Sequence, residues 1–401
     1  MKNYSHIQIV FILMSFILSF AFGLDVYIPI LPQMTRIFNT TPALVQLTMS
    51  LFLFTIAIGQ LIVGPLSDQF GRKSVLLVSS LFFGLGSLAC TFSTEIIWLI
   101  AMRIVSGIGA CGMLVTSFAL VRDLLSHDES AKMYSFLNGA IGISPTFAPI
   151  LGGYIAAYWG WKSVFIFLSL IALYSLFVAY YFIQETLEPA KRVKINRDIF
   201  QRYCQIYKNR QFIIFSSISG FSQAVFFGFF SISPFIIIDL LGVSPRYFGY
   251  YFAIFGLVLC LGGLASGKII EKVGVYTTLK IGIGLMLSGG VLMLAWSMVA
   301  PLSLISFLIP MVVACTGAIF LVGSSASVAL EPFPTIAGTA SAAFGCLEFG
   351  ICSCVGAALM LFPIHSTVPY GICIILMALF SGSLFRMREK TVSPVIDFSS
   401  L

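Results

Sequence analysis

Charged residues are scarce in this chain. Asp, Glu, Lys and Arg together make up 9% of its 401 residues, whereas a soluble domain carries about 25%. So small a charged minority cannot cover a water-facing surface of this size. With 59% hydrophobic residues and a mean hydropathy of +1.03, the composition excludes a soluble globular protein. It indicates an integral membrane protein whose surface mostly meets lipid.

Patterns of metal ligands and catalytic groups are missing as well. The three histidines, His6, His127 and His365, are dispersed, and none of the nine cysteines has zinc-finger spacing. Cys352 and Cys354 would point apart on one helix. We interpret the cysteines as small apolar packing residues and expect no metal and no cofactor. No nucleophile–base set or phosphate-binding loop is visible, so the sequence does not indicate an enzyme.

Long apolar runs are abundant instead. A helix crosses a bilayer with about 20 apolar residues, and backbone groups in lipid must be satisfied within the segment. The first run, which follows Lys2, is longer than a signal peptide and lacks its cleavage site, so we expect a retained helix. The sequence predicts twelve transmembrane helices, at residues 7–33, 43–66, 74–93, 96–121, 133–157, 162–184, 211–238, 247–267, 277–298, 301–328, 336–361 and 368–386.

The distribution of cations orients these spans. An even number of spans places both termini on one side. With the termini in the cytoplasm, eighteen of the 22 Lys and Arg residues lie in cytoplasmic segments. Three lie in outer loops (Arg36, Lys162 and Arg246), and Arg103 lies within a span. The positive-inside rule therefore favours cytoplasmic termini, and we expect a multi-pass protein of a bacterial inner membrane.

A polar stretch divides the chain into halves. Residues 1–184 are predicted to form an N-terminal six-helix bundle, and residues 211–401 a C-terminal six-helix bundle with a short tail. Residues 185–210 form a cytoplasmic linker whose cations rest against anionic headgroups, with a regulatory segment as the alternative. The halves repeat: an offset of 203 residues maps Gly64, Asp68 and Gly71 onto Gly267, Glu271 and Gly274. Two parallel halves are typical of one transporter architecture.

Four segments resemble motifs of the major facilitator superfamily. GPLSDQFGRK (64–73) matches its signature between helices 2 and 3, and RIVSGIGACG (103–112) resembles its helix-4 motif. SPTFAPILGG (144–153) resembles the helix-5 motif of exporters, and LDVYIPILP (24–32) resembles helix 1 of twelve-helix drug/proton antiporters. With AGTASAAFG in helix 11, the chain is most similar to the Bcr/CflA drug-resistance group. The resemblance implies an all-α membrane fold of two pseudo-symmetric six-helix bundles.

The chain departs from these motifs in three places. Ser144 replaces a glycine of the helix-5 motif, and Ala148–Pro149 stands where the family usually has Gly-Pro. The Ala-Pro variant is itself similar to the Bcr/CflA group. Ile17 occupies a position where some multidrug relatives carry a second helix-1 acid. This last departure disfavours a two-proton mechanism within the first helix.

Three ionisable residues fall well inside spans: Asp25, Arg103 and Glu348. Each costs at least about 2.5 kcal/mol at the bilayer centre, so each needs a reason. Burial favours the neutral form of a carboxyl and a nearby arginine favours the charged form, which suits Asp25 as a proton carrier. The alternatives for Asp25 are a static ion pair or a helix-end acid near the outer interface.

Arg103 and Glu348 complete the predicted coupling residues. Arg103 is a fixed cation, and Gly107, Gly109 and Gly112 allow another backbone to come close. We expect Arg103 to hydrogen-bond helix 1 and modulate Asp25; a structural staple is the alternative. Glu348 is a second proton site or a contact for cationic drugs, or else a protonated acid that is hydrogen-bonded within the bundle.

The helix 2–3 link is predicted to act in gating. Gly64 would let a neighbouring helix approach, and Asp68 would meet the positive N-terminus of helix 11, as the resemblance implies. Arg72 would pair with Asp123 at the cytoplasmic end of helix 4. Opening this network would let the halves rock. The alternative is a topology signal, and the residues of the predicted gating motif are Gly64, Asp68, Gly71, Arg72, Lys73, Asp123 and Glu271.

Helix 5 and the central cavity supply the remaining candidates. Pro145 and Pro149 would bend helix 5, and Gly152 and Gly153 would allow tight packing. This indicates a kinked gate, or merely a bent, packed helix. Cargo would bind near the midplane, against small residues and adaptable Met and Phe side chains. The candidates are Ala21, Met49, Ala110, Asn138 and Ile141 in the first half, and Gln223, Phe226, Phe227 and Phe230 in the second.

The sequence thus predicts a proton-coupled exporter of small amphipathic compounds. Its partners are expected to be protons, small-molecule cargo and the lipid bilayer, with no nucleic acid, and the protein is expected to be a monomer. A dedicated exporter of a metabolite, such as a siderophore or an amino acid, is the main alternative. A non-transporting membrane receptor or scaffold is the alternative from another class.

Overall fold

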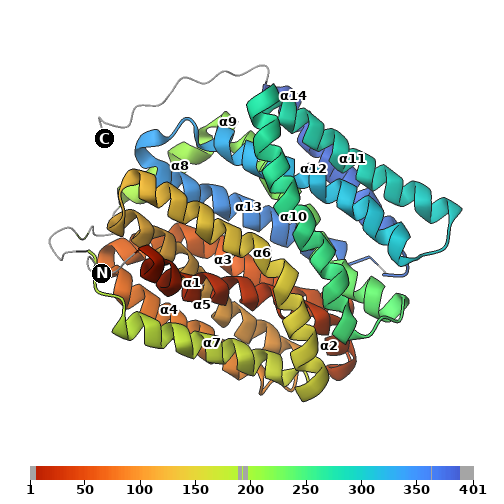
Figure 1. The fold of residues 1–401 in the computed structure, drawn as a ribbon, viewed down its shortest axis with the longest axis horizontal. Helices are drawn as coiled ribbons and strands as arrows, with labels where there is room; N and C mark the ends of the chain where they lie inside the picture. Colours follow the sequence, from red (N-terminus) through yellow and green to blue (C-terminus); the bar gives the residue numbers. More distant parts are fainter. Residues whose placement is uncertain (1–5, 188–191, 193–196, 363, 389–401) are drawn as a thin grey trace. The chain divides into compact units, whose positions relative to one another are not determined.

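The structure is a computed structural model that describes residues 6–187, 192, 197–362 and 364–388 (Figure 1). The described residues form helices and no strands, and twelve helical spans are long and apolar enough to cross a membrane. The predicted number of spans is therefore confirmed, and their limits agree with the sequence to within a few residues. The first span is compound, with α1 (His6–Asp25), η1 (Ile28–Ile30) and α2 (Leu31–Ile37) in series.

The chain divides into two compact units, which we describe separately. The first comprises Met1–Ile199 and Pro245–Ala253, and the second comprises Phe200–Ser244 and Ile254–Leu401. The remaining helices of the first unit are α3 (Pro42–Phe70), α4 (Arg72–Cys90), α5 (Ile96–Leu124), α6 (His127–Trp159) and α7 (Lys162–Tyr181). In this unit α5 packs against α3 and α4, and α1 packs against α5, α6 and α7.

The second unit is built around α9. Its helices are α8 (Arg197–Lys208), α9 (Arg210–Pro234) with the π-helical η3 (Phe235–Leu240), α11 (Val275–Val299), α12 (Leu304–Leu330), η4 (Pro334–Ile336) with α13 (Ala337–Leu359), and α14 (Val368–Arg388). Helix α9 packs against α12, α13 and α14, and α11 packs against α12 and α14. Helix α10 (Pro245–Val273) contributes its first residues to the first unit and the rest to the second.

Local sequence signals explain where several helices begin. Thr41 caps α3 by accepting a hydrogen bond from the Leu44 amide at 3.4 Å, and Pro42 follows at the first helical position, where its fixed φ suits a helix start. Ser303 and Ser306 form a reciprocal cap on α12. Such caps satisfy amides that have no partner inside the helix.

The internal repeat has a structural counterpart at Gly71 and Gly274. Gly71 ends α3 and precedes α4 with φ +95°, and Gly274 ends α10 and precedes α11 with φ +81°. Both values lie in the left-handed region that favours glycine. The two residues are 203 positions apart in the sequence. In each half, therefore, a glycine with positive φ connects the second transmembrane helix to the third.

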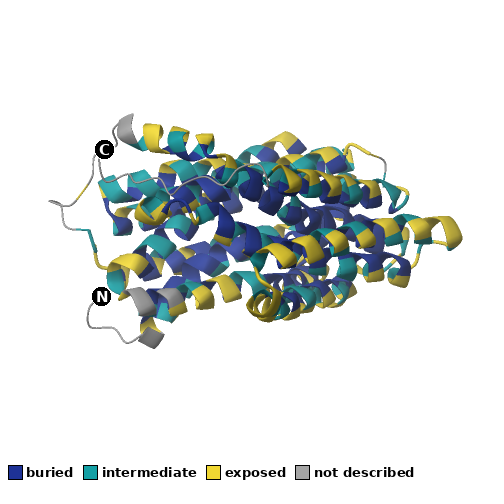
Figure 2. Cartoon of the chain, turned by 90° about the horizontal axis from the view of Figure 1, so that it is seen from above, coloured by how far each residue is buried: buried dark blue, intermediate teal, exposed yellow. Residues whose placement is uncertain are grey.

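The helices have covered and open sides, and Figure 2 shows buried and exposed positions alternating along single helices. On α7 the open side is apolar: Leu173 is 61% exposed and Phe177 is 50% exposed. Water would not favour such a surface. The spacing of the exposed apolar side chains is consistent with helices whose outer sides meet lipid, as the composition indicates.

Helix α8 attaches the end of the polar stretch to the second unit. Ile206 and Tyr203 are buried, and the Tyr207 hydroxyl donates a hydrogen bond to the Ala343 carbonyl of α13 at 3.2 Å. Burial raises the pKa of the Tyr207 phenol, so its hydroxyl remains a donor. Phe200 and Arg202 lie on the exposed side.

Candidate functional site

Asp25 is buried at the end of α1, with 4% of its surface exposed. Its partner is Ser144 of α6, whose Oγ donates a hydrogen bond to Asp25 Oδ2 at 2.7 Å. No Lys or Arg of the described chain forms an ion pair with this carboxyl. A buried carboxyl that has a hydroxyl and no cation beside it carries a high cost when it is charged. The alternative of a static ion pair is therefore not found among the described residues.

Arg103 of α5 is completely buried in an aromatic cage. Its guanidinium carbon lies 4.1 Å from the ring centre of Phe52 and 5.2 Å from that of Tyr27. Its Nε donates to the Thr48 carbonyl of α3 at 3.3 Å. Nη1 and Nη2 have no hydrogen-bond partner among the described residues. Ring faces attract a cation but leave these N–H groups available to an acceptor.

The hydrogen bond that we expected from Arg103 to the first helix is not present. Tyr27, which follows α1, supplies a ring face instead of an acceptor, and the acceptor comes from α3. Close packing of α5 on α3 is the reason: a Cβ added at Gly107 would lie 3.0 Å from the Phe52 carbonyl oxygen. This approach brings Thr48 within reach of Arg103. The described contacts do not join Arg103 to Asp25.

The glycines of α5 allow close helix packing, as predicted. A Cβ at Gly109 would collide with backbone atoms of Phe83 and Ser79 on α4, and one at Gly112 would collide with the Ser79 side chain. Small residues at such positions let helix backbones approach closely. The face of α5 that carries Arg103 is thereby fixed between α3 and α4.

Glu348 occupies a similar position in the second unit. It lies on α13 with 8% of its surface exposed, and Ser219 of α9 donates a hydrogen bond from Oγ to Glu348 Oε1 at 2.6 Å. Within the described chain it forms no ion pair. Nearby, Cys352 Sγ donates to the Gln223 carbonyl at 3.6 Å. The carboxyl is thus held by a hydroxyl from a neighbouring helix, as Asp25 is.

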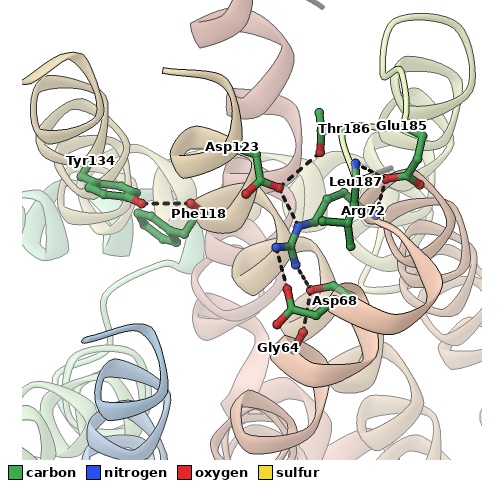
Figure 3. Close-up of polar contacts among 10 residues, drawn as sticks. Gly64, Asp68, Arg72, Phe118, Asp123, Tyr134, Glu185, Thr186 and Leu187 are labelled. Atoms are coloured by element: carbon green, nitrogen blue, oxygen red, sulfur yellow. Dashed lines mark hydrogen bonds and ion pairs between the residues drawn. The ribbon is translucent and has the colours of Figure 1, made fainter. Parts of the chain in front are cut away.

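The link between α3 and α4 forms a polar network (Figure 3). Arg72 Nη2 lies 2.6 Å from Asp68 Oδ1, and Arg72 Nε lies 2.9 Å from Asp123 Oδ2. The Thr186 hydroxyl also donates to Asp123 Oδ2, at 3.2 Å. Glu185 Oε1 accepts a hydrogen bond from the Arg72 backbone amide at 2.9 Å and so caps α4. The predicted pairing of Arg72 with Asp123 is confirmed.

Other members of the predicted gating motif behave differently. A Cβ at Gly64 would meet no atom within 4 Å, so the first unit shows no close approach at this glycine. Lys73 donates from Nζ to the Tyr180 carbonyl at 2.8 Å. Glu271 is exposed and forms no ion pair with any described residue.

Helix α6 runs through both prolines as one helix, from His127 to Trp159. A Cβ at Gly152 would collide with the Val26 carbonyl, just past Asp25, and one at Gly153 would lie 2.6 Å from the Pro245 carbonyl oxygen. The predicted tight packing at these glycines is therefore present. It presses α6 against the segment that carries Asp25.

The cargo candidates differ in exposure. Ala21, Met49 and Ala110 are buried in the first unit, Asn138 is exposed and Ile141 is half-buried. In the second unit Gln223 is half-buried, and Phe226, Phe227 and Phe230 are buried. Phe255 of α10 contacts the rings of Phe226 and Phe230, with centroids 5.6 and 5.3 Å apart. No group of three potential metal ligands occurs within the described ranges.

The sequence did not indicate Ser144, Ser219 and Glu185 as hydrogen-bond partners of Asp25, Glu348 and Arg72. Ser144 carried a signal, because it replaces a glycine of the helix-5 motif. Ser219 carried none, since a serine in an apolar helix commonly bonds to its own backbone. Glu185 stands at the start of the polar stretch, where a charged residue needs no partner. Its hydrogen bond to the Arg72 amide becomes visible only in the structure, where the start of α4 lies beside the end of the sixth span.

A family model described as Major Facilitator Superfamily matches residues 11–357. A chloramphenicol resistance protein of Pseudomonas aeruginosa is 30% identical over 396 residues, covering 97% of this chain and 92% of the relative. A bicyclomycin resistance protein homolog of Haemophilus influenzae is 28% identical over 370 residues, covering 89% and 91%. The multidrug resistance protein MdtL of Salmonella heidelberg is 29% identical over 341 residues, covering 84% of each chain.

Solved structures show the same fold at lower identity. A D-xylose-proton symporter matches with a TM-score of 0.74 and 19% identity, over 94% of this chain and 97% of the symporter. A peptide transporter matches with a TM-score of 0.77 and 12% identity, over 95% and 94% of the two chains. These likenesses describe the fold of the chain.

Proposed function

Because the chain belongs to the major facilitator superfamily, and is thus a multi-pass membrane transporter rather than an enzyme, we propose that it is a proton-coupled antiporter. Its cargo would be small amphipathic compounds, exported by alternating access. The names of its relatives support this cargo class, since they concern resistance to chloramphenicol, bicyclomycin and several drugs. The charge bias favours cytoplasmic termini in a bacterial inner membrane, and we propose that the protein acts as a monomer.

The observation that carries the proposal is the environment of Asp25. The carboxyl is 4% exposed and is bonded to the Ser144 hydroxyl, with no cation paired to it. Burial without a counter-charge favours the neutral carboxyl, and access to water restores the charged form. Asp25 would therefore bind a proton from water on the outer side, keep it while the carboxyl is buried, and release it when a change of state exposes the carboxyl to water on the inner side.

Arg103 would act on Asp25 at a distance rather than by direct contact. Its charge is permanent, and two of its nitrogen atoms lack a partner. In a different state of the transporter these N–H groups could donate hydrogen bonds to a carboxylate, a water molecule or a carbonyl group of the cargo. Each of these partners would make the position of α5 depend on whether cargo is bound or on whether a nearby carboxyl is charged.

The network around Arg72 would act in gating. It ties the α3–α4 link to the end of α5 through Asp123 and to the start of the polar stretch through Glu185 and Thr186. We propose that Asp68, which is 41% exposed, keeps an oxygen available to a partner outside this network. Glu271 would play the corresponding part in the second half.

Cargo would contact the small and aromatic residues predicted above. Ala21, Met49, Ala110, Asn138 and Ile141 would supply room and apolar contact in the first half. In the second half Gln223 would supply a polar group, and Phe226, Phe227 and Phe230 would supply ring faces. Aromatic rings hold both apolar and cationic compounds, which fits a varied set of drugs.

Transport in liposomes with an imposed pH gradient tests the proposal. Purified wild-type protein is expected to move chloramphenicol or another member of a drug panel against the proton flow, and Asp25→Asn is expected to abolish this movement. Glu95→Gln, which removes an exposed acid in the loop before α5, is the matched control and should transport normally. Gradient-independent movement that survives Asp25→Asn would refute proton coupling by this residue.

The same assay separates the rivals. Movement of a siderophore or amino acid alone, with no drug accepted, would support a dedicated metabolite exporter. Accumulation in the direction of proton flow would indicate uptake. No movement of any compound would favour a receptor or scaffold.

A further inference from the structure

Each unit contains one buried acid, and each acid is held by one serine. Asp25 and Glu348 are the only buried Asp or Glu residues in the described part of the chain. In the first unit the acid lies on α1 and its serine, Ser144, on α6; in the second unit the acid lies on α13 and its serine, Ser219, on α9. Helices α1 and α9 are the first spans of the two halves, and α6 and α13 are the fifth spans. In each half, therefore, an acid–serine hydrogen bond joins the first span to the fifth. The acid is on the first span in the first half and on the fifth span in the second half.

Among the described residues of the second unit, no charge lies where it could balance Glu348. Helix α13 packs against α9, α12 and α14, and it is contacted by Tyr207 of α8. The ionisable residues of α9 and α12 are Arg210, at the first position of α9, and Cys315. Those of α14 are Tyr370, Cys373, Arg386 and Arg388, and those of α13 itself are Cys346, Cys352 and Cys354. Every cation among them stands at a helix end.

Among the described residues of the helices around Asp25, Arg103 is the one buried charge. Helix α1 packs against α5, α6 and α7. Their ionisable residues outside the terminal turns are Arg103 and Cys111 on α5, Lys132, Tyr134 and Tyr154 on α6, and Tyr174 on α7. Arg103 is engaged by the Thr48 carbonyl and two rings. Neither buried acid is therefore neutralised by an ion pair.

A serine hydroxyl suits a carboxyl that changes its protonation state. The hydroxyl donates to a carboxylate, and after rotation it accepts from a carboxylic acid. The pair can thus stay bonded in both states, whereas an arginine, which only donates, favours the carboxylate. A contact for a cationic drug would need an open carboxylate, but Glu348 is 8% exposed and one oxygen is occupied by Ser219.

We propose that Glu348 is a second proton-binding site, held by Ser219, and that the protein moves two protons for each cargo molecule, one through each half. This inference rests on the proposed function. The two proton sites lie in different halves. They are not two acids of the first helix, since Ile17 occupies the position that a second acid would need there. Ser219 and Ser144 are positioning residues, and the carboxyls bind the protons.

Infrared spectroscopy of the purified full-length protein in lipid tests the sites without any cargo. The stretching band of protonated carboxyl groups is recorded as the pH is raised. Wild type is expected to show buried carboxyl intensity that disappears at alkaline pH, about half of it absent in Glu348→Gln and about half in Asp25→Asn, with none in the double variant, since two sites contribute. Unchanged titrating intensity in Glu348→Gln would overturn the inference.

Serine variants show whether the hydroxyl positions the acid. Ser219→Ala is expected to shift the Glu348 band and the pH at which it disappears. Ser222→Ala is the matched control, since Ser222 is buried on the same helix and donates to the Ile218 carbonyl of its own helix at 2.8 Å. It should leave the band unchanged, and size-exclusion profiles confirm that all variants fold. An unshifted band in Ser219→Ala would refute the positioning role.

Coupled transport gives the stoichiometry. At balance, a tenfold proton gradient should sustain about a hundredfold gradient of neutral chloramphenicol in wild type and about a tenfold gradient in Glu348→Gln, because each coupled proton multiplies the ratio once. A tenfold gradient in wild type would contradict two-proton coupling while leaving antiport intact. A titrating Glu348 band with no gradient-driven transport would instead contradict the proposed function.

Discussion

Arg72 Nε lies 2.9 Å from Asp123 Oδ2, and the two residues stand 51 positions apart in the sequence. The pair joins the first turn of α4 to the last turn of α5. Arg72 is buried, with 3% of its side chain exposed, and it also contacts Asp68 and the Ser67 hydroxyl. One cation therefore links the ends of three helices of the first unit, α3, α4 and α5.

The two acids beside Arg72 should differ in their contribution to stability. Asp123→Asn should lower the free energy of unfolding by about 1–3 kcal/mol, since Asp123 is 19% exposed and also accepts from Thr186. Asp68→Asn should cost less than about 1 kcal/mol, because its side chain is 41% exposed and water screens the pair. Thermal unfolding in detergent measures both. Equal losses would show that exposure does not decide the strength of these pairs.

Replacing Ser144 should change the pH dependence of transport. Its hydroxyl donates to Asp25 Oδ2, a bond that favours the carboxylate. In Ser144→Ala the carboxyl should keep its proton to a higher pH, so the midpoint of the transport profile should move upward. A hydrogen bond to a charged group is worth about 1.5–3 kcal/mol, which corresponds to about one pH unit or more.

Ser117→Ala is the control for the Ser144 experiment. Ser117 is buried on α5 and donates to the Met113 carbonyl of its own helix at 2.7 Å. Its replacement should leave the profile in place. A downward or absent shift in Ser144→Ala would mean that the hydroxyl does not stabilise the charged form.

Alanine at Gly71 should destabilise the protein more than alanine at Gly274. Both glycines have positive φ, which costs another residue about 1–2 kcal/mol. At Gly71 the added Cβ would also collide with the Glu185 carboxyl, whereas at Gly274 it would meet nothing within 4 Å. The difference between the two variants in thermal stability measures the effect of this collision. The additional loss of stability in Gly71→Ala should become smaller when Glu185 is also replaced by Ala. Identical losses would rule out a steric role for Glu185.

Alanine at Gly109 should impair the packing of α5 on α4. The added Cβ would meet backbone atoms of Phe83 and Ser79, which cannot move aside as a flexible side chain could. Overpacking of this kind costs about 1–3 kcal/mol or more. Gly142→Ala on α6 is the matched control, because its Cβ would meet nothing within 4 Å, and it should be neutral or gain about 0.5–1 kcal/mol. Detergent stability and yield check both.

The sequence predicted those features that depend on local pattern. Twelve apolar runs of sufficient length indicated twelve spans, and the spacing of Gly71 and Gly274 indicated a repeat whose backbone conformation the structure reproduces. The pairing of Arg72 with Asp123 could be predicted because opposite charges at the same membrane face attract. The burial of Asp25 and Glu348 followed from their place in apolar helices.

Features that depend on which faces meet could not be predicted in this way. The prediction that Arg103 hydrogen-bonds the first helix was wrong. The packing of α5 on α3 at Gly107 brings the Thr48 carbonyl to Arg103 instead, and the sequence does not reveal that packing. The serines that hold the two acids come from helices far away in sequence. Rotation of a helix by part of a turn would have presented other residues, and composition does not fix that rotation.

The cap that Glu185 places on α4 has a consequence for biosynthesis. The Arg72 amide and the Glu185 carboxyl that accepts its hydrogen bond are 113 residues apart. A chain made from its N-terminus thus completes α4 and three further spans, α5, α6 and α7, before Glu185 has been synthesised. The cap on α4 cannot form until the ribosome has passed Glu185, so maturation of this end of the first half is timed by translation of the connecting segment.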